Sequence, residues 1–472
     1  MIGPRARVAI GLAFLVYVVF FRTYDITGTF LLLGEQMRDW TLALGSWRDL
    51  PLTGTPSTSG GRGFGPIYYW ILWSGRHLIG PFTSNLPHAG GLTVALLQAV
   101  ADAWLFIVLA RRISLPLALA VGLIMATGPF DVGLSKAIWN PPVATALVKM
   151  TIAQMLTLGN TPALWRIAAV SATAWFAVQA HSSGFFVAAP VFAALVVQPL
   201  ARAKALALQD TMESDGFSRR WRRALEHARV VVEVIVVLEI PYVIAQFRTP
   251  ASTIGPTVVF DSLANAAKLE VATSFSTVVN ITGELVMHRH DTWSFALVTV
   301  IAAAIAAWRW RRDVPMLSVS VGPLFAATAL FSTWTRPYDS YWFLALAPSM
   351  VLTLALVVTA IPRALVSRAV SVALILLALY WQPARFRESQ ETFPYPPYRP
   401  LLEGSRAALR RAPVLRHLRV AFPIHETTDT EYMYRILGGR IEPTAEFDGK
   451  IQPDGTVVFT PAPPISPDPK IP

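Results

Sequence analysis

Residues 91–130 read GLTVALLQAVADAWLFIVLARRISLPLALAVGLIMATGPF, two apolar runs separated by the pair Arg111 and Arg112. A helix that crosses a hydrocarbon core about 30 Å thick needs roughly 20 residues, and each run approaches that length. Paired basic residues in a short loop between such runs are typical of the cytoplasmic side of a membrane protein. The stretch therefore predicts two membrane-spanning helices, and the rest of the chain repeats its pattern.

The composition of the whole chain indicates the same class of protein. Of its 472 residues, 54% are hydrophobic and 15% are charged, and the mean hydropathy is +0.47. A soluble domain carries about 25% charged residues, so this chain has too few to cover a water-facing surface. The formal charge of +11 comes from short loops between apolar runs, as the positive-inside rule predicts, and we expect no nucleic acid partner. With no cysteine, the chain has no disulfide and no thiolate nucleophile.

We predict an all-α polytopic membrane protein with about eleven spans. The predicted spans are residues 7–21, 91–110, 113–130, 143–158, 165–180, 184–199, 229–247, 291–308, 315–333, 341–360 and 367–381. The first has a basic flank and no small-residue cleavage site after it, so we interpret it as an uncleaved span with a cytoplasmic N-terminus. The lipid bilayer is thus a partner of the whole chain, and we expect a multi-pass protein of the plasma (inner) membrane.

The basic loops predict the orientation of the spans. Placing the loops at 111–112, 202–223, 309–312 and 363–368 inside puts 131–142, 181–183, 248–290 and 334–340 outside. Segment 64–82 then cannot cross completely, because the chain must still be outside when the span at 91–110 begins. Its short apolar run ends in Arg76 and His77, which suits a helix that lies at the interface. A full crossing here, giving about twelve spans, is the rival topology.

Two domains are predicted. Residues 1–381 form the transmembrane domain, in which 22–90 is a large first external loop with juxtamembrane helices. Residues 382–472 form a small extramembrane module on the external, periplasmic side. The module starts with the proline-rich TFPYPPYRP, contains the strand-like GTVVFTP and ends in PAPPISPDPKIP, which we expect to be disordered.

The first external loop contains the acidic stretch LGEQMRDW at 33–40. On a helix, Glu35 and Asp39 share a face, and Arg38 flanks Glu35. An unpaired carboxylate at mid-membrane costs about 2.5–3.5 kcal/mol, so the pair belongs at the water boundary. Two interpretations stay open: a solvated surface helix with an Arg38 salt bridge, or a catalytic base with an orienting partner beside a membrane-level pocket.

The order of several motifs resembles that of GT-C superfamily membrane glycosyltransferases of the family 39-like type, which include protein mannosyltransferases and aminoarabinose transferases. The matching segments are GEQMRD at 34–39 (a DQARDA-type acidic helix), PLTG at 51–54 with STSGG at 57–61 (a PLLGP–S–GG loop), GPIYY at 65–69 (GPxYY), SKAIWNP at 135–141 (SRxxWNP) and QAH at 179–181 (QLH). The resemblance covers residues 10–200. Glu35 stands where the family usually has Asp, so Asp39 ranks beside it as the base.

The resemblance implies a GT-C-like fold and an inverting transfer of a sugar from a polyprenyl-phosphate-linked donor. The acceptor would be a glycan, lipid or protein at the external membrane face. A carboxylate would take the proton of the acceptor hydroxyl, and cations would stabilise the phosphate leaving group. The candidate catalytic residues are Asp39 and Glu35, and the candidate substrate-binding residues are Arg38, Arg62, Pro66, Tyr68, Tyr69, Lys136, Asn140, His181 and Arg336.

No cofactor follows with certainty from the sequence. The run MHRHD at 287–291 contains ligand types that bind metals, but at a span boundary such a run is more often an interfacial anchor. We therefore assign no metal ligands and leave a divalent cation open.

A transporter or flippase for a lipid-linked or small polar substrate is the alternative function, and an inactive scaffold with the same fold is a third. The predicted spans are interpreted as nearly free of charge apart from Asp102 and Glu233, which favours chemistry at the external face.

Overall fold

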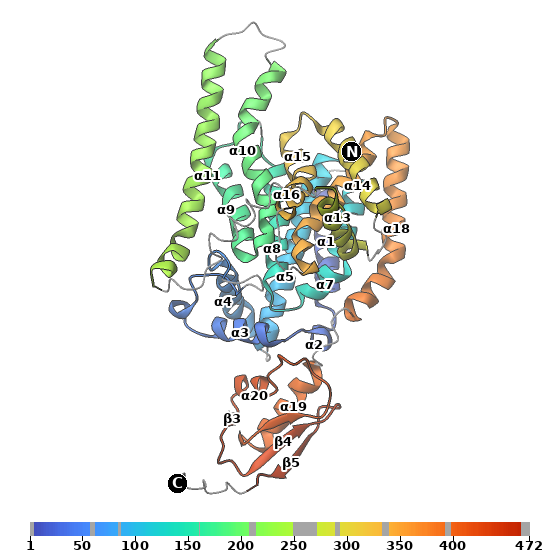
Figure 1. The fold of residues 1–472 in the computed structure, drawn as a ribbon. Coiled ribbons are helices and arrows are strands. Elements are labelled where there is room, and N and C mark those ends of the chain that lie inside the picture. Colours follow the sequence, from blue (N-terminus) through green and yellow to red (C-terminus); the bar gives the residue numbers. More distant parts are fainter. Residues whose placement is uncertain are drawn as a thin grey trace.

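The computed structural model describes residues 4–56, 62–83, 86–159, 161–206, 214–248, 271–287, 293–332, 339–391 and 398–463. It is a helical bundle with a small α/β module attached at one end (Figure 1). The first helices are α1 (Pro4–Thr23), α2 (Ile26–Thr29), α3 (Gly34–Leu44), α4 (Ile67–Ile79), α5 (Leu86–Arg112), α6 (Leu115–Ala126), α7 (Pro129–Ser135), α8 (Asn140–Leu156), α9 (Leu164–Ala180), α10 (Phe185–Leu206) and α11 (Ser214–Arg248), with short 3₁₀ turns η1 (Trp47–Asp49), η2 (Gly80–Phe82) and η3 (Ser182–Gly184). The later helices are α13 (Val271–Met287), α14 (Trp293–Trp310), α15 (Val314–Val319), α16 (Val321–Phe331), η5 (Ser340–Leu346), α17 (Ala347–Leu356), η6 (Val357–Ala360) and α18 (Ala364–Glu391).

Each predicted span overlaps one helix or a run of two or three consecutive helices. The span at 113–130 is broken, since α6 and α7 meet at an angle of 57° and Pro129 begins the second helix. Five described helical segments are long and apolar enough to cross a membrane, and the bent pair adds a sixth if it counts as one span. The structure confirms the polytopic helical fold, and the number of eleven spans stays a prediction.

Three basic loops lie at one end of the bundle. Arg112 after α5 forms an ion pair of 2.6 Å with Asp313 after α14. Trp310 Nε1 donates to Thr359 Oγ1 at 3.0 Å, which adds the turn before α18 to the same end. The N-terminus lies at this end and the C-terminal module at the other (Figure 1). The basic loops thus lie together at one end of the bundle, as the charge pattern predicts. The assignment of this end to the cytoplasm stays a prediction.

Helix α4 lies beside α3 and does not cross the bundle. Near its start, the Tyr69 hydroxyl donates to Asp39 of α3 at 3.1 Å. Near its end, Arg76 donates to the carbonyl oxygens of Leu44 and Gly45, just past the same helix. Since α3 has only 11 residues, both ends of α4 lie at one end of the bundle. This arrangement agrees with the prediction that 64–82 does not cross and argues against the twelve-span alternative.

Helix α13 falls in the region 248–290, which the sequence analysis placed in an external loop. The helix packs against α7, α14, α16 and η5 and buries Val278, Val279 and Thr282. Its apolar face needs a partner surface, and the neighbouring helices supply one. The described part of this region is therefore a component of the bundle rather than a water-facing loop.

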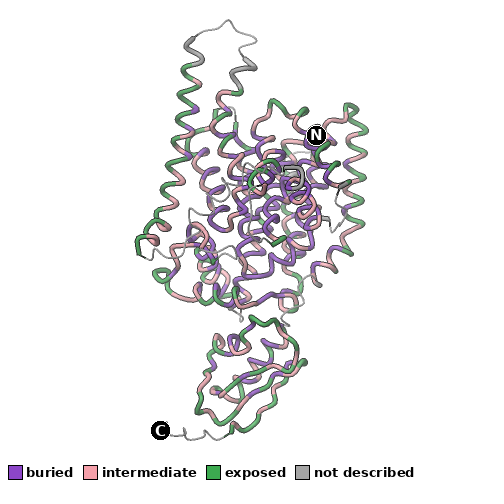
Figure 2. The backbone as a smooth tube through the Cα atoms, viewed as in Figure 1, coloured by how far each residue is buried: buried purple, intermediate pink, exposed green. Residues whose placement is uncertain are grey.

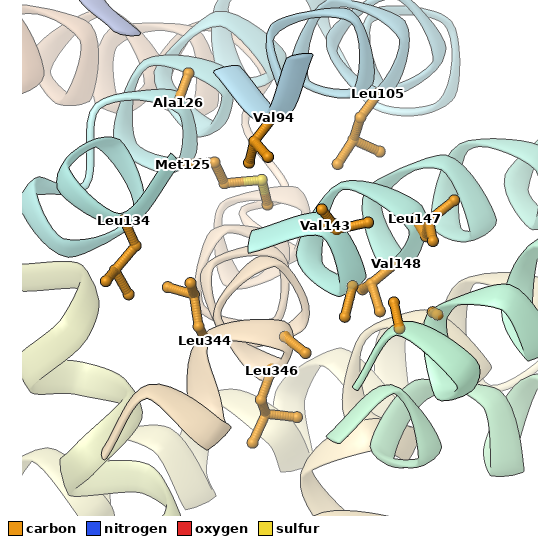
Figure 3. Packing of buried hydrophobic residues seen from close by; sticks show 14 of the residues in the cluster. Val94, Leu105, Met125, Ala126, Leu134, Val143, Leu147, Val148, Leu344 and Leu346 are labelled. Atoms are coloured by element: carbon orange, nitrogen blue, oxygen red, sulfur yellow. The ribbon is translucent and has the colours of Figure 1, made fainter. Parts of the chain in front are cut away.

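The core lies between α5, α6, α7, α8 and η5. Figure 3 shows Val94, Met125, Leu134, Val143 and Leu344, one from each of these elements, gathered around a common interior. Helices α11 and α18 lie at the periphery, and many of their residues are exposed (Figure 2). Much of that exposed surface is apolar, as expected where helices face lipid.

The compact C-terminal unit begins at Tyr398, because α18 continues past the predicted boundary at 381 to Glu391. Its elements are α19 (Tyr398–Arg411), β1 (Val414–Leu415), β2 (Leu418–Val420), α20 (Tyr432–Ile436), β3 (Arg440–Ile441), β4 (Phe447–Ile451) and β5 (Val457–Pro461). β1 pairs with β3 in parallel, while β4 pairs in parallel with β2 and antiparallel with β5. The strand-like GTVVFTP contains β5. Thr41 Oγ1 of α3 donates to the Tyr432 hydroxyl at 3.1 Å, so the module contacts the helix that carries the acidic pair.

Four ionisable side chains are buried together between α1, α5, α7 and α8. Arg22 lies 2.7 Å from Asp102 and 2.6 Å from Asp131. Lys149 lies 2.8 Å from each of the same two carboxylates. Two positive and two negative charges thus neutralise one another, which is the condition under which buried charges are tolerated.

This network corrects the count of charges within the spans. Lys149 lies in the predicted span 143–158 and pairs with Asp102 of the span 91–110. Glu239 lies in the span 229–247 and accepts from Trp175 Nε1 at 2.7 Å. The spans therefore contain more charged residues than Asp102 and Glu233. The low charge of the spans is accordingly a weaker argument for external-face chemistry over transport.

We expect Lys149→Met to destabilise the protein by about 3–5 kcal/mol, because it leaves two buried carboxylates with one arginine. The change should appear as a lower midpoint of thermal unfolding of the purified protein in detergent. Arg229→Met is the matched control, since Arg229 pairs with Glu233 on an exposed helix surface and its loss should change the midpoint little. Equal midpoints for the two variants would contradict the structural role of the network.

Candidate functional site

A cavity lies at the end of the bundle that carries the C-terminal module. Its lining residues are Glu35, Arg38, Asp39, Thr55, Pro56, Gly63, Trp139, Asn140, Ala180, His181, Ser182, Tyr341 and Trp342. They come from α3, the loop before α4, the start of α8, the end of α9 and η5. Four of these segments lie in or extend into three regions predicted to be external, namely 22–90, 131–142 and 181–183. Segments far apart in the sequence therefore meet at one cavity.

Asp39 is the buried carboxylate of this cavity, with 1% of its surface exposed. Nε of Arg38 donates to its Oδ1 at 2.8 Å, and the Tyr69 hydroxyl donates to the same oxygen at 3.1 Å. Burial raises the pKa of Asp39, while the Arg38 charge and these hydrogen bonds oppose the rise. A carboxylate with a raised pKa is a better proton acceptor than one in water, so the site suits a general base.

Glu35 lines the same cavity from an exposed position on α3. Desolvation by the cavity wall and then the charge of Asp39 raise the pKa of Glu35. Nε2 of Gln36 donates to Glu35 at 3.3 Å, a weaker restraint than the donors that hold Asp39. The two carboxylates therefore differ in environment, and Asp39 is the more firmly oriented one.

The GPIYY segment contacts Asp39 but does not line the cavity. Tyr68 and Tyr69 are fully buried near the start of α4, and neither lines the cavity. The Tyr68 hydroxyl acts on Asp39 too, as one of the hydrogen bonds that lower the pKa of that carboxyl group. Pro66 is also buried and precedes the first residue of α4, so it sets where that helix begins.

Gly65 makes the close contact between this segment and α9. Its φ angle is +60°, in the left-handed region that favours glycine. A Cβ atom at this position would lie 2.2 Å from the side chain of Gln179. Gln179 is itself held by α11, where its Nε2 donates to Glu239 at 3.0 Å. Both the backbone angle and the packing therefore require glycine here.

Asn140 joins three of the segments that line the cavity. Its Nδ2 donates to Thr55 Oγ1 at 3.0 Å and to the Ala180 carbonyl oxygen at 2.9 Å. These bonds tie the start of α8 to the loop before α4 and to the end of α9. Because its amide protons are already used, Asn140 shapes the cavity and offers its carbonyl oxygen to a ligand.

His181 lines the cavity as a neutral imidazole. Its Nδ1 lies 2.7 Å from Ser183 Oγ, and its ring packs edge-on against Trp342. Burial lowers the pKa of His181 to about 4, so the ring carries no charge near neutral pH. It can exchange hydrogen bonds with a ligand, but it does not provide a positive charge for a phosphate.

Lys136 does not reach the cavity. Its Nζ lies 3.0 Å from both Thr29 Oγ1 and Gln390 Oε1, and 3.2 Å from the Tyr24 carbonyl oxygen. Burial lowers the pKa of Lys136 to about 8. The side chain therefore links the segment after α1 to the end of α18, and the structure does not support its assignment to substrate binding at the cavity.

The two remaining arginine candidates have different positions. Arg62 is partly exposed next to Gly63, which lines the cavity, although Arg62 itself does not. Its backbone forms an antiparallel bridge with Pro56, so the loop before α4 closes on itself. Arg336 lies outside the described residues.

The described residues contain no group of three or more His, Asp or Glu side chains placed to hold a metal ion. In the run at 287–291, everything after Met287 lies outside the described part of the chain. A divalent cation stays open as a cofactor.

Sequence reasoning missed an aromatic wall of the cavity. The rings of Trp139 and Tyr341 lie 4.6 Å apart, centroid to centroid, and Trp342 continues the wall. Trp139 belongs to the motif SKAIWNP, where only its neighbours were singled out. Tyr341 and Trp342 begin the predicted span 341–360, and nothing near them in the sequence indicates their contact with Trp139.

The whole fold is similar to that of ArnT from Cupriavidus metallidurans. The structure of that protein bound to undecaprenyl phosphate matches with a TM-score of 0.52 at 14% identity, covering 94% of this chain and 87% of that one. Its apo structure matches with a TM-score of 0.50 at 14% identity, covering 91% and 84%. An Archaeoglobus fulgidus oligosaccharyltransferase in complex with Zn and sulfate gives 0.45 at 12% identity, covering 92% and 57%. No family model and no curated protein matches the chain.

The chain therefore shares the fold of ArnT, which agrees with the resemblance that the order of its motifs indicated. At this level of identity the likeness defines the architecture, and the chemistry must be argued from the cavity itself.

We expect Gly65→Ala to destabilise the protein by about 1–3 kcal/mol, because alanine is strained at this φ angle and its Cβ would overlap Gln179. Thermal unfolding in detergent measures the loss. Gly159→Ala is the control, since a Cβ atom there would have no neighbour within 4 Å. If Gly65→Ala were as stable as the control, the described approach of this loop to α9 would be wrong.

Proposed function

We propose that this protein is a glycosyltransferase that moves a sugar from a polyprenyl-phosphate-linked donor to an acceptor at the external face of the membrane. The observation that carries the proposal is the buried, oriented carboxylate of Asp39 in a cavity at the end of the bundle away from the basic loops. The shared fold with ArnT, which binds undecaprenyl phosphate in its crystal structure, supports the class of donor.

Asp39 is suited to act as the base because of how its two oxygens are used. Nε and NH2 of Arg38 and the Tyr69 hydroxyl all contact Oδ1. Oδ2 is then the oxygen that accepts the proton of an acceptor hydroxyl. As that hydroxyl oxygen bonds to the anomeric carbon, the bond from this carbon to the phosphate oxygen breaks, and the phosphate leaves with the electron pair. A single displacement of this kind inverts the anomeric configuration.

The leaving phosphate needs positive charge near the cavity. Arg38 lines the cavity with 40% of its side chain exposed, and Arg62 lies in the adjoining loop. Lys136 and the neutral His181 do not provide this charge. We therefore assign the cationic role to Arg38 and Arg62, and the orienting role towards Asp39 also to Arg38. Glu35, exposed at the same cavity, would position the acceptor.

Transport remains the competing function, and the ionic network within the bundle is the feature that would favour it. That network is neutral, however, and Arg22, Asp102, Asp131 and Lys149 are all paired with one another. It therefore has no unpaired charge with which to bind a substrate. Asp131 and Lys149 line a small cavity inside the bundle, but the cavity that combines carboxylate and aromatic side chains lies at the bundle end, where a reaction at the membrane surface would occur.

Asp39→Asn should lower the turnover of sugar transfer by about 10²–10⁴-fold, the usual contribution of a general base. Glu35→Gln should lower it less, because that carboxylate is exposed and loosely held. Purified protein is assayed for transfer of labelled sugar from a panel of polyprenyl-phosphate sugars. Asp49→Asn, an exposed carboxylate outside the cavity, is the control and should stay fully active. Full activity of Asp39→Asn would refute its role, and substrate movement without a new glycosidic bond would indicate a transporter.

The pH profile of kcat/KM should lose activity towards acid as Asp39 becomes protonated, since only the ionised form accepts a proton. Arg38→Gln removes the charge that opposes the raised pKa of Asp39, so the acid limb should move to higher pH. Arg48→Gln, at an exposed site on η1, should leave the limb in place. An acid limb that is unchanged or lower in Arg38→Gln would show that a different group is being titrated.

A further inference from the structure

A second cavity, of about 780 Å³, lies at the opposite end of the bundle, among the basic loops. Arginine and tryptophan side chains dominate its lining, with Arg112, Arg309, Arg311 and Arg312 among them, together with Trp308 and Trp310. Its size falls in the range of ligand-binding pockets, roughly 300–1,000 Å³. It shares no lining residue with the cavity around Asp39.

The lining of this cavity has an excess of positive charge. Asp313 is the acidic residue of the lining, and its carboxylate is already paired with NH2 of Arg112. Arg309, Arg311 and Arg312 then remain without a carboxylate partner among the described residues. The Arg309 and Arg311 side chains donate hydrogen bonds to backbone carbonyl oxygens at 3.2 and 2.9 Å, and their guanidinium groups lie over the Trp310 and Trp308 rings.

The polar groups of the cavity are not all satisfied by the protein. Nε of Arg112 is buried and has no hydrogen-bond partner among the described residues. The three arginines without a carboxylate partner leave positive charge that a bound anion would neutralise. Guanidinium groups match the geometry of phosphate oxygens, which favours a phosphate as that anion.

The position of the cavity along α14 corresponds to the level of the lipid headgroups. Helix α14 exposes a run of apolar side chains that includes Leu297, Val298 and Ile301, and it ends at the cavity. Arg309 follows Ile301 by about 12 Å along the helix axis, close to the half-thickness of about 15 Å of a hydrocarbon core. Trp308, 63% exposed, lies at the boundary where tryptophan is enriched in membrane proteins. A lipid whose chains cover α14 would bring its headgroup to the arginines.

We propose that this cavity binds the phosphate headgroup of an anionic membrane lipid, with Arg309, Arg311 and Arg312 as its donors. The lipid's chains lie against the apolar surface of α14, and its phosphate neutralises the excess charge of the loops. This site is independent of sugar transfer, and it lies at the other end of the bundle.

The test compares Arg311→Gln/Arg312→Gln with Arg363→Gln/Arg368→Gln. The first pair removes two arginines of the cavity whose side chains make no bond to another helix in the described structure. The second pair removes two exposed arginines from near the same end, outside the cavity. Purified proteins are titrated with phosphatidylglycerol, phosphatidylcholine or inorganic phosphate, and the thermal midpoint is recorded. Lipid that copurifies with each protein is quantified by mass spectrometry.

We expect phosphatidylglycerol to raise the midpoint of the wild type and of Arg363→Gln/Arg368→Gln, and phosphatidylcholine and inorganic phosphate to leave it unchanged. Loss of about 1 kcal/mol for each arginine near the membrane surface corresponds to about fivefold weaker binding per residue. Arg311→Gln/Arg312→Gln should therefore need at least tenfold more phosphatidylglycerol and retain less of it on purification.

Three results would overturn the proposal. Equal lipid responses of the two double variants would show that general surface charge is responsible. An equal response to phosphatidylcholine would show that the headgroup charge is not recognised. An equal response to inorganic phosphate would identify a soluble-anion site. Failure of sugar transfer in any assay has no bearing on this outcome, because the readouts are stability and bound lipid.

Discussion

The buried pairing of Arg22 and Lys149 with Asp102 and Asp131 constrains the rest of the structure. A charge left unpaired in an apolar interior costs several kcal/mol, so α1, α5, α7 and α8 cannot shift separately. Gln98 of α5 extends the network, because its Nε2 donates to the carbonyl oxygen of Pro142 at 2.7 Å. That bond fixes the first turn of α8, where Asn140 reaches the two neighbouring walls of the cavity. Internal electrostatics thus determines the shape of a site at the bundle end.

Features that depend on local sequence were predictable. Hydropathy acts over a window of residues, so the positions of the spans follow from composition, and the loops with Arg112 and Asp313 meet at one end as the charge pattern indicates. The placement of α4 was predictable for the same reason, since its apolar run is too short to cross. The carboxylates of LGEQMRDW were recognised because charge is conspicuous in an apolar chain, and they do line a cavity.

What the sequence could not provide was the partner of each polar side chain. Lys136 and Lys149 both stand near apolar runs, yet Lys136 bonds to α18 and Lys149 to two carboxylates on other helices. Nothing within a few residues of either lysine distinguishes these outcomes, because the partners are set by tertiary packing. The wall formed by Trp139 and Tyr341 was missed for the same reason: the two rings belong to segments that the topology alone brings together.

The two ends of the bundle differ in how their charged side chains are neutralised, and this difference affects what each end can do. Around Asp39, the protein supplies the donors itself, so the carboxylate is held in one geometry before any ligand arrives, as a reacting group requires. Around Arg312, the arginines are exposed and outnumber the carboxylates, so neutrality must come from outside the chain. Preorganisation at one end suits chemistry, whereas the incomplete charge balance at the other suits binding to a charged membrane surface.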